Sequence, residues 1–543
     1  MPVKKIRALL NAASFPPTYR YAGRSIIDNN DLNARMPGIF YGAKENADFG
    51  IPQLLFCENV LPFAKGLFSV SFGDLVAAHT PATTLMDQAI VLRDADENLT
   101  LFVPAKGANY VLSHTTGLWT SKSPFSFTGE LVTRAYVNGR TFVLYEGVKL
   151  VEYDAGTGIL NTIALTLPVG YTIADIRGIG GAQNYLLLFT DLEVLWCAPS
   201  NILDFANTDG GAGGQIPLDL KGKITALLPV PGGFIVYSQR NAVGASYTDD
   251  ATRPFVFREI TNSGGVPNYE RVTAEANERG HFAWTSSGLQ KISLQAAETF
   301  SPEITDFLVG ENYEVWNPTT KQVDLTEING AFSVKMGFVA SRYLIISYGQ
   351  ERNQFDGALV FDVVLERWGK LVLTHCDVFM YPYPAVGGDY FYDDLPGFYA
   401  DLGENTYDDL DVVRVQVTPP KRGIAFLKND GSVSLLNTDF TQTGANGVIL
   451  IGHIQSDRAS QITCHRVETE NLKSEGSPVV SLLLSEEGTD FERVSTLTLS
   501  DSSDRWRKYD CREVGESFDV AIEGNFVLSG LYLDVARHGY RTT

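Results

Sequence analysis

The fold class is decided by the stretch Leu131-Val132-Thr133-Arg134-Ala135-Tyr136-Val137-Asn138-Gly139-Arg140-Thr141-Phe142-Val143-Leu144-Tyr145. Apolar and polar residues alternate on both sides of Asn138-Gly139, a dipeptide that favours the type I′ turn because both of its residues accept a positive φ. A second turn at Glu146-Gly147 leads into another alternating segment, 149–154. We therefore predict an antiparallel meander of three strands.

Similar units recur along the chain. They open near Ala89, Leu131, Ala174, Ile224 and Val272, at spacings of about 42, 43, 50 and 48 residues, which are typical of propeller blades. Two later units, 343–373 and 424–436, would extend the ring. We predict an all-β fold with a β-propeller of about six to seven blades, because each blade needs neighbours to bury its faces. A pair of β-sandwiches with coincidental spacing is the alternative.

The flanking segments differ in texture and predict three domains. Residues 1–65 are rich in Pro and Asn and are expected to form an irregular N-terminal arm. Residues 66–445 would hold the propeller, with insertions near 296–333 and 374–419. Residues 446–543 contain longer apolar runs and are expected to form a small C-terminal β-sandwich-like module.

Composition excludes several classes of protein. The 543 residues contain 43 Lys plus Arg against 64 Asp plus Glu, a formal net charge of −21. Proteins that bind nucleic acid tightly need clustered basic residues to displace phosphate counterions, and this acidic chain lacks that excess. No apolar run reaches the ~18 residues of a membrane span, and the first apolar run is interrupted by Asn11, so we expect neither a span nor a signal peptide.

The cysteines predict no disulfide framework and no zinc site. Five of them are dispersed along the chain and never form a C-x-x-C pair: Cys57, Cys197, Cys376, Cys464 and Cys511. An odd, scattered set suits a protein made in a reducing cytoplasm. We expect no metal and no cofactor.

The segment 374–411 is the most acidic part of the chain and contains no Lys or Arg. Tyrosines are interleaved with its acids, and the tetrapeptide Tyr-Asp-Asp-Leu occurs twice, at 392–395 and 407–410. The favoured interpretation is a solvated acidic loop; a calcium site and a surface that faces DNA are the alternatives. The candidate channel or interface residues are Asp389, Asp393, Asp394, Asp401, Asp408, Asp409 and Asp411.

No catalytic constellation stands out, and we predict that the protein is not an enzyme. Val76-Ala77-Ala78-His79 and Asn262-Ser263-Gly264-Gly265 echo protease motifs, but Asn262 stands where an acidic residue would precede the serine. The second motif is better interpreted as a turn. Phosphate-binding loops and paired histidines at ligand spacing do not occur in the sequence.

Four short segments resemble one family, the β-propeller tail nozzle or tail hub (packaged-DNA stabilisation) proteins of short-tailed bacteriophages. They are 23–33, which resembles the opening of the family; 359–370, with its strand, Asp, turn and Arg-Trp; the duplicated Tyr-Asp-Asp-Leu; and 524–536, which is similar to a C-terminal strand pair. The segments occur in the order that the family has.

The resemblance implies a structural virion protein that forms a homo-oligomeric ring, a hexamer, below the portal and adaptor. Such a ring continues and closes the DNA channel and takes part in genome retention and DNA ejection. It implies contact with head-to-tail adaptor or portal proteins and with a distal tail needle or tail fibre. Genomic double-stranded DNA would pass without tight binding. The protein would be made in the host cytoplasm and end in the virion tail. A carbohydrate-binding or polysaccharide-cleaving β-propeller is the alternative function.

Overall fold

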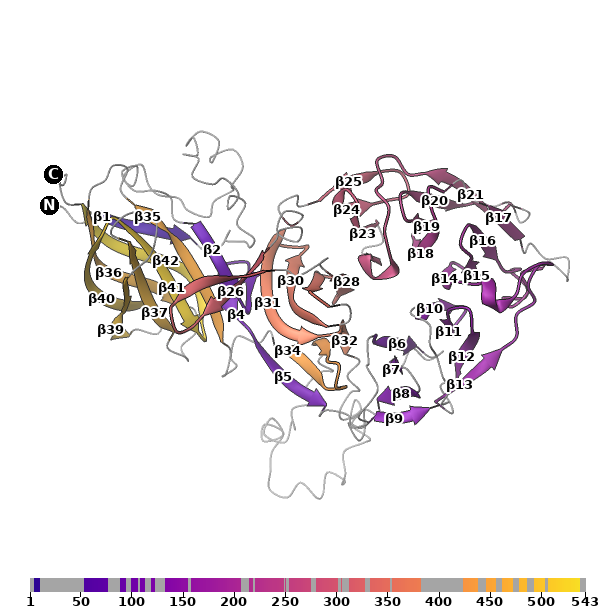
Figure 1. The fold of residues 1–543 in the computed structure, drawn as a ribbon, viewed down its shortest axis with the longest axis horizontal. Coiled ribbons are helices and arrows are strands. Elements are labelled where there is room, and N and C mark those ends of the chain that lie inside the picture. Colours follow the sequence, from indigo (N-terminus) through magenta and orange to yellow (C-terminus); the bar gives the residue numbers. More distant parts are fainter. Residues whose placement is uncertain are drawn as a thin grey trace, which may run out of the picture.

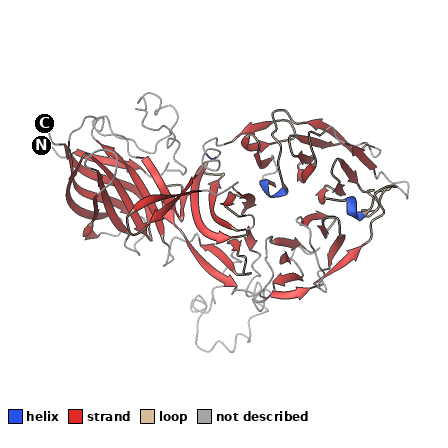
Figure 2. Ribbon diagram, in the orientation of Figure 1, coloured by secondary structure: helices blue, strands red, loops and turns tan. Residues whose placement is uncertain are grey.

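A computed structural model was obtained for the chain. It describes residues 4–9, 53–76, 88–93, 99–105, 108–112, 119–122, 132–154, 158–206, 214–217, 220–248, 250, 253–274, 280–300, 304, 312–327, 333–351, 354–381, 423–437, 446–455, 461–471, 478–485, 493–502 and 506–537. The described part is built of antiparallel strands with two short 3-10 helices, η3 (Ile173–Asp175) and η4 (Tyr269–Arg271) (Figure 2). The all-β prediction is confirmed.

Five four-stranded sheets follow one another along the chain, each made of consecutive strands. The first contains β6 (Ile90–Arg93), β7 (Leu99–Ala105), β8 (Ala108–Leu112) and β9 (Trp119–Lys122). The second contains β10 (Val132–Val137), β11 (Arg140–Tyr145), β12 (Lys149–Asp154) and β13 (Ile159–Ile163). The third contains β14 (Gly178–Ala182), β15 (Tyr185–Phe189), β16 (Glu193–Trp196) and β17 (Gly214–Pro217). The fourth contains β18 (Ile224–Val230), β19 (Gly233–Ser238), β20 (Ala242–Tyr247) and β21 (Phe255–Glu259). The fifth contains β22 (Val272–Ala274), β23 (His281–Thr285), β24 (Gly288–Ile292) and β25 (Ala297–Thr299).

Two more units complete the arrangement. The sixth is formed by β28 (Ser333–Val339), β29 (Tyr343–Gly349), β30 (Phe355–Asp362) and β31 (Arg367–His375), which lie at one end of an eleven-stranded sheet. The seventh contains β32 (Asp377–Tyr381), β33 (Gly423–Leu427), β34 (Val433–Asn437) and, from the N-terminal part of the chain, β5 (Ser71–Val76).

Figure 1 shows these seven units arranged as a ring around a common centre. The first strands of neighbouring units touch: β10 contacts β14, β14 contacts β18, β18 contacts β22, β22 contacts β28, and β28 contacts β32. β6 contacts both β32 and β11, so the first unit lies between the seventh and the second. We call this arrangement the ring.

The hairpin that decided the fold class forms as predicted. Val137 pairs with Arg140 across the turn, and Asn138 and Gly139 have φ of 51° and 76°. The inward residues of both strands are buried; Phe142 and Leu144 lie in a core cluster that also contains Leu187 and Phe234 from the next two sheets. Apolar alternation thus places each sheet between its neighbours.

Apart from one hairpin, the remaining described strands form two layers, which we call the sandwich (Figure 1). One layer is the five-stranded sheet of β2 (Gln53–Glu58), β35 (Gly447–Gln455), β41 (Ser517–Gly524), β37 (Val479–Ser485) and β38 (Arg493–Thr496). The other layer is the remainder of the eleven-stranded sheet: β3 (Val60–Phe63), β4 (Gly66–Ser69), β42 (Val527–Arg537), β36 (Ile462–Asn471), β40 (Trp506–Gly515), β39 (Thr498–Ser502) and β1 (Lys4–Leu9), which pairs with β42. Ile451 and Val520 of the first layer share one apolar cluster with Val467 and Leu533 of the second.

The eleven-stranded sheet physically joins the ring to the sandwich. Its order runs from β31 of the ring through β3 and β4 to β42 of the sandwich. Val60 pairs with Lys370 at the first of these steps, and Leu67 pairs with Leu528 at the last. A single hydrogen-bonded sheet therefore links the two bodies.

The structure differs from the expected N-terminal arm. Where residues 1–65 are described, they form strands: β1 and β2 pair with strands of the sandwich, and β3 lies between ring and sandwich. Apart from the β3–β4 hairpin, their partners are more than 300 residues away in sequence, so local alternation in a Pro- and Asn-rich context gave no sign of these pairings.

The insertion predicted near 296–333 includes β25 of the fifth sheet and a separate hairpin. It contains β26 (Asn312–Asn317) paired with β27 (Gln322–Glu327). Trp316 stacks on Phe56 of β2, and its indole N–H donates to a carboxylate oxygen of Glu523 at 2.8 Å. The hairpin is thus held against the chain's own sandwich, because Trp316 buries its ring there.

Candidate functional site

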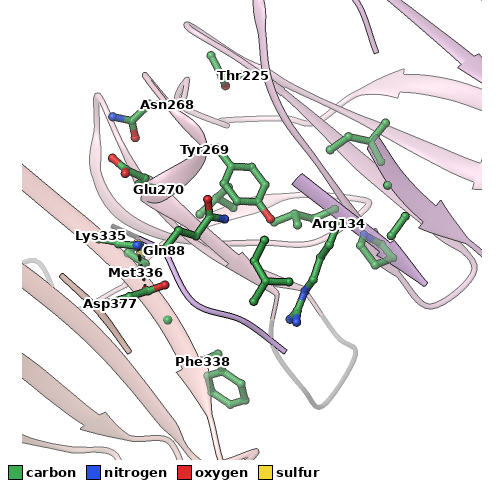
Figure 3. A pocket seen from close by; sticks show the side chains of 18 of the residues that line it. Gln88, Arg134, Thr225, Asn268, Tyr269, Glu270, Lys335, Met336, Phe338 and Asp377 are labelled. Atoms are coloured by element: carbon green, nitrogen blue, oxygen red, sulfur yellow. Dashed lines mark ion pairs between the residues drawn. The ribbon is translucent and has the colours of Figure 1, made fainter. Parts of the chain in front are cut away.

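The ring encloses a cavity of about 930 Å³ at its centre. Its walls come largely from the first strands of the sheets and from η4, so residues far apart in sequence face one another: Gln88, Arg134, Thr225, Tyr269, Lys335 and Asp377 (Figure 3). Cavities of this size are typical of small-molecule sites. We therefore describe its chemistry group by group.

Asp377 ties three units of the ring together. It is the first residue of β32, and its Oδ1 lies 2.9 Å from Nζ of Lys335 on β28. Its Oδ2 accepts a hydrogen bond of 2.6 Å from the backbone N–H of Ala89, which precedes β6. Only 11% of the Lys335 side chain and 9% of that of Asp377 are exposed. Burial lowers the pKa of Lys335, but the charges of Asp377 and Glu270 outweigh burial, so the pKa is raised and the amine stays charged.

Gln88 and Arg134 hold the first and second sheets together at the cavity wall. Nε2 of Gln88 donates to the carbonyl of Val132 at 2.9 Å, and a guanidinium N–H of Arg134 donates to the carbonyl of Val91 at 2.6 Å. The two bonds run in opposite directions between the sheets. Side chains thus connect the first and second sheets, whose strands are not paired with each other.

Tyr269 lies on η4 and extends into the cavity toward Arg134 (Figure 3). Burial raises its pKa; the charges of Arg134 and Lys335 oppose the rise and that of Asp377 adds to it. Its hydroxyl is therefore protonated at neutral pH and can donate a hydrogen bond. Next to it, Oδ1 of Asn268 is buried without a hydrogen-bond partner.

The cavity offers hydrogen-bonding and charged side chains to a ligand. Its described lining includes amides, two tyrosines, carboxylates and cations, but no Ser, Cys or His. Ser263 lies elsewhere: its Oγ donates to the carbonyl of Ile260 and accepts from the N–H of Ala242. The prediction of a turn at Asn262-Ser263 is confirmed by these bonds and by the φ of 61° at Asn262. His79 lies outside the described residues.

A second group of polar residues lies where the ring meets the sandwich. Asp362 ends β30, and its Oδ1 accepts the N–H groups of Val364 and Leu365, which fixes the turn into β31. Arg342 binds the other oxygen of Asp362. Arg367, the next residue after the turn, donates to the carbonyls of Phe63 at 2.8 Å and of Gly66 at 3.3 Å. Arg367 therefore caps the β3–β4 turn from the ring side.

Lys370 lies almost fully buried opposite Val60, at the start of β3. Its Nζ is 3.7 Å from Oε1 of Glu58 and 4.4 Å from the centre of the Phe56 ring. Burial raises the pKa of Glu58, and the charge of Lys370 opposes the rise. Oε1 of Glu58 also accepts the backbone N–H of Trp316 at 2.9 Å. Ring, sandwich and the β26–β27 hairpin thus share one charged cluster.

The candidate residues from sequence fall outside the described part of the chain. Asp389, Asp393, Asp394, Asp401, Asp408, Asp409 and Asp411 all lie in 382–422. The residues that flank this segment, Tyr381 and Gly423, are paired in register on β32 and β33. Asp377, which sequence counted with the same acidic segment, is instead a buried strand residue. Sequence reasoning also missed Lys335 and Lys370; the available signal was a single lysine inside an apolar strand.

Within the described residues, no group of three or more His, Cys, Asp or Glu side chains could hold a metal ion. The same residues contain no helix long and apolar enough to cross a membrane.

Comparisons with known proteins leave the family open. No family model matches the chain, and no curated protein matches it. Among solved structures, the extracellular domain of a putative hybrid two-component system from B. thetaiotaomicron is similar with a TM-score of 0.32 and 13% identity. The match covers 58% of this chain and 45% of that one, so the chain spans less than half of that structure's length.

Proposed function

We propose that this chain is a structural subunit of a short bacteriophage tail. Its ring of seven units is a seven-bladed β-propeller, and the fused sandwich carries part of the contacts between subunits. Copies assemble into a ring, a hexamer, that continues the DNA channel below the portal and adaptor. The ring closes the channel until ejection and meets a tail needle or fibre at its distal end.

One observation carries the proposal. Two of the segments that resemble tail nozzle proteins, 359–370 and 524–536, belong to the same sheet, where β30–β31 and β42 are separated only by β3 and β4. In the first segment Asp362 makes the turn and Arg367 reaches the β3–β4 carbonyls. The residues that carry the resemblance are thus those that couple the propeller to the sandwich. Rigid coupling suits a subunit that must hold a channel under load.

The acidic insertion supports a role in the channel wall. It leaves one sheet of the ring between Tyr381 and Gly423, and it carries no basic residue between 382 and 411. A surface of one negative sign repels the phosphates of a duplex, so DNA slides instead of binding. We propose that Asp393, Asp394, Asp408 and Asp409 face the passing DNA.

The assembly is tested by measuring the mass of the purified protein by light scattering, alone and after mixing with the portal and adaptor complex. A sixfold ring on that complex, seen by negative-stain imaging, is the expected result. A monomer that ignores the complex would rule out the tail function.

The channel role is tested by DNA ejection. A variant with the four substitutions Asp393→Asn, Asp394→Asn, Asp408→Asn and Asp409→Asn is expected to assemble normally but to slow ejection. The matched control neutralises four exposed acids elsewhere: Asp175, Glu259, Glu298 and Glu366. Equal ejection rates in both variants would contradict the channel role while leaving the assembly proposal untouched.

The central cavity favours a second candidate, a carbohydrate-binding propeller. An aromatic side chain beside amides and carboxylates suits sugar hydroxyls, and Tyr269, Asn268 and Glu270 provide that combination. Retention on a glycan column that is lost in Asn268→Ala would favour this function over the tail function.

A further inference from the structure

Cys464 and Cys511 lie side by side in the sandwich although 46 residues separate them in sequence. Cys464 is on β36 and Cys511 on the neighbouring strand β40, and their Sγ atoms are 3.4 Å apart. Sγ of Cys511 is also 3.3 Å from the carbonyl oxygen of Cys464. The two thiols thus already face each other before any bond is made.

A β-bulge produces this meeting. Cys464 pairs with Glu513 and Arg466 pairs with Asp510, so one residue of β36 opposes two residues of β40 between these pairs. The shift brings Cys511 beside Cys464 instead of across a regular ladder position. The ion pair between Arg466 and Asp510, 2.8 Å long, fixes the register next to the bulge.

The two thiols differ in access. Cys464 is buried, whereas Cys511 is partly exposed. The hydrogen bond with Cys511 and burial raise the pKa of Cys464, so Cys464 remains a protonated thiol. The other three cysteines, Cys57, Cys197 and Cys376, are each buried in a different core cluster.

We propose that Cys464 and Cys511 are a modification site. A low-molecular-weight disulfide oxidises the two thiols, which then form an intrachain disulfide. The thiolate of Cys511 attacks one sulfur of the reagent, which forms a mixed disulfide and releases one thiolate. Sγ of Cys464 then attacks Sγ of Cys511, loses its proton to water and expels the second thiolate. Two protein thiols are oxidised and one reagent disulfide is reduced to two thiols.

The bond would fasten β40 to β36. β40 holds the edge strand β39, and residues 465–510, which include β37 and β38, lie within the closed loop. Closing a loop of this length restricts the unfolded chain and so favours the folded sandwich. The proposal is independent of the tail function, because it requires only the fold of the sandwich.

Oxidised glutathione is the probe. After incubation of the full chain and denaturation, the expected result is the loss of two of the five titratable thiols. Proteolytic mapping should find a peptide that links Cys464 to Cys511, and oxidised protein should unfold at a higher urea concentration than reduced protein. Cys511→Ser removes the more accessible thiol. In this variant no intrachain disulfide should form, and all four remaining thiols should stay titratable.

Cys464→Ser separates the two steps. It should keep one glutathione on Cys511, because no second thiol is in reach to displace it. In wild-type protein, by contrast, a persistent glutathione on Cys511, a disulfide between two chains, or five unchanged thiols would each overturn the proposal. The mapping on wild-type protein decides the matter even where Cys464→Ser does not fold.

Discussion

Lys335 and Asp377 form a buried ion pair of 2.9 Å between two adjacent sheets of the ring, and the same carboxylate accepts the N–H of Ala89 before the first sheet. The sixth, seventh and first units thus meet at one side chain. Because the first and seventh units lie far apart in sequence, this contact is made only when the ring is complete.

Asp377→Asn is expected to destabilise the protein by about 3–5 kcal/mol, because Lys335 stays buried without its anion. The matched control is Asp191→Asn, which breaks the solvent-accessible pairs of Asp191 with Lys223 and Arg177, whose side chains are 63% and 37% exposed. Exposed pairs contribute only about 0–1 kcal/mol. Urea unfolding measures both; equal losses would contradict a special role for Asp377.

Lys370→Met is expected to destabilise the junction of ring and sandwich by about 3–5 kcal/mol, because Glu58 would remain buried without its cation. The double variant Lys370→Met with Glu58→Gln should recover part of the loss, since the amide can still accept the N–H of Trp316. A double-mutant cycle from urea unfolding gives the coupling. Additive losses would contradict the pairing.

The repeat positions could be predicted from sequence because they depend on local alternation. Ile224 and Val272 open β18 and β22 as expected, and Ala89 and Leu131 each lie one residue before a strand. The fourth strand of the seventh unit could not be predicted, because β5 pairs with β34 across more than 350 residues. The same reason hid Asp377 and the Cys464–Cys511 pair: each acquires its chemistry from a partner that only the fold supplies.

Gly66→Ala is expected to cost about 1–3 kcal/mol, the usual range for an overpacked site. An added Cβ would lie 1.9 Å from the carbonyl oxygen of Leu528, a backbone atom that cannot rotate away. Gly73 on β5 is the matched control, because a Cβ there meets nothing within 4 Å. Gly73→Ala should change stability by less than about 0.5 kcal/mol. Thermal or urea unfolding compares the two, and a harmless Gly66→Ala would contradict the close approach of β4 to β42.

Acid should weaken the fold before most carboxylates titrate, because two buried histidines are held neutral. Nε2–H of His281 donates to the carbonyl of Pro229, and Nδ1 accepts from the hydroxyl of Tyr237. In His375, Nδ1–H donates to the carbonyl of Leu373, and Nε2 accepts from Ser347. Each ring therefore uses one nitrogen as donor and the other as acceptor, an arrangement that only the neutral form satisfies.

Burial lowers the pKa of both His281 and His375 to about 4. The unfolded chain, with histidine pKa values near ~6.5, binds more protons than the folded chain between these limits. Stability is therefore complete above about pH 6.5 and is lost as the pH falls toward 4, by up to about 1.4 kcal/mol per pH unit for each histidine. His375→Gln should lower stability at neutral pH but reduce this slope, because one of the two protons no longer binds. Urea unfolding at several pH values between about 7 and 4.5 measures the slope. An unchanged slope in His375→Gln would show that this ring is not the group that titrates.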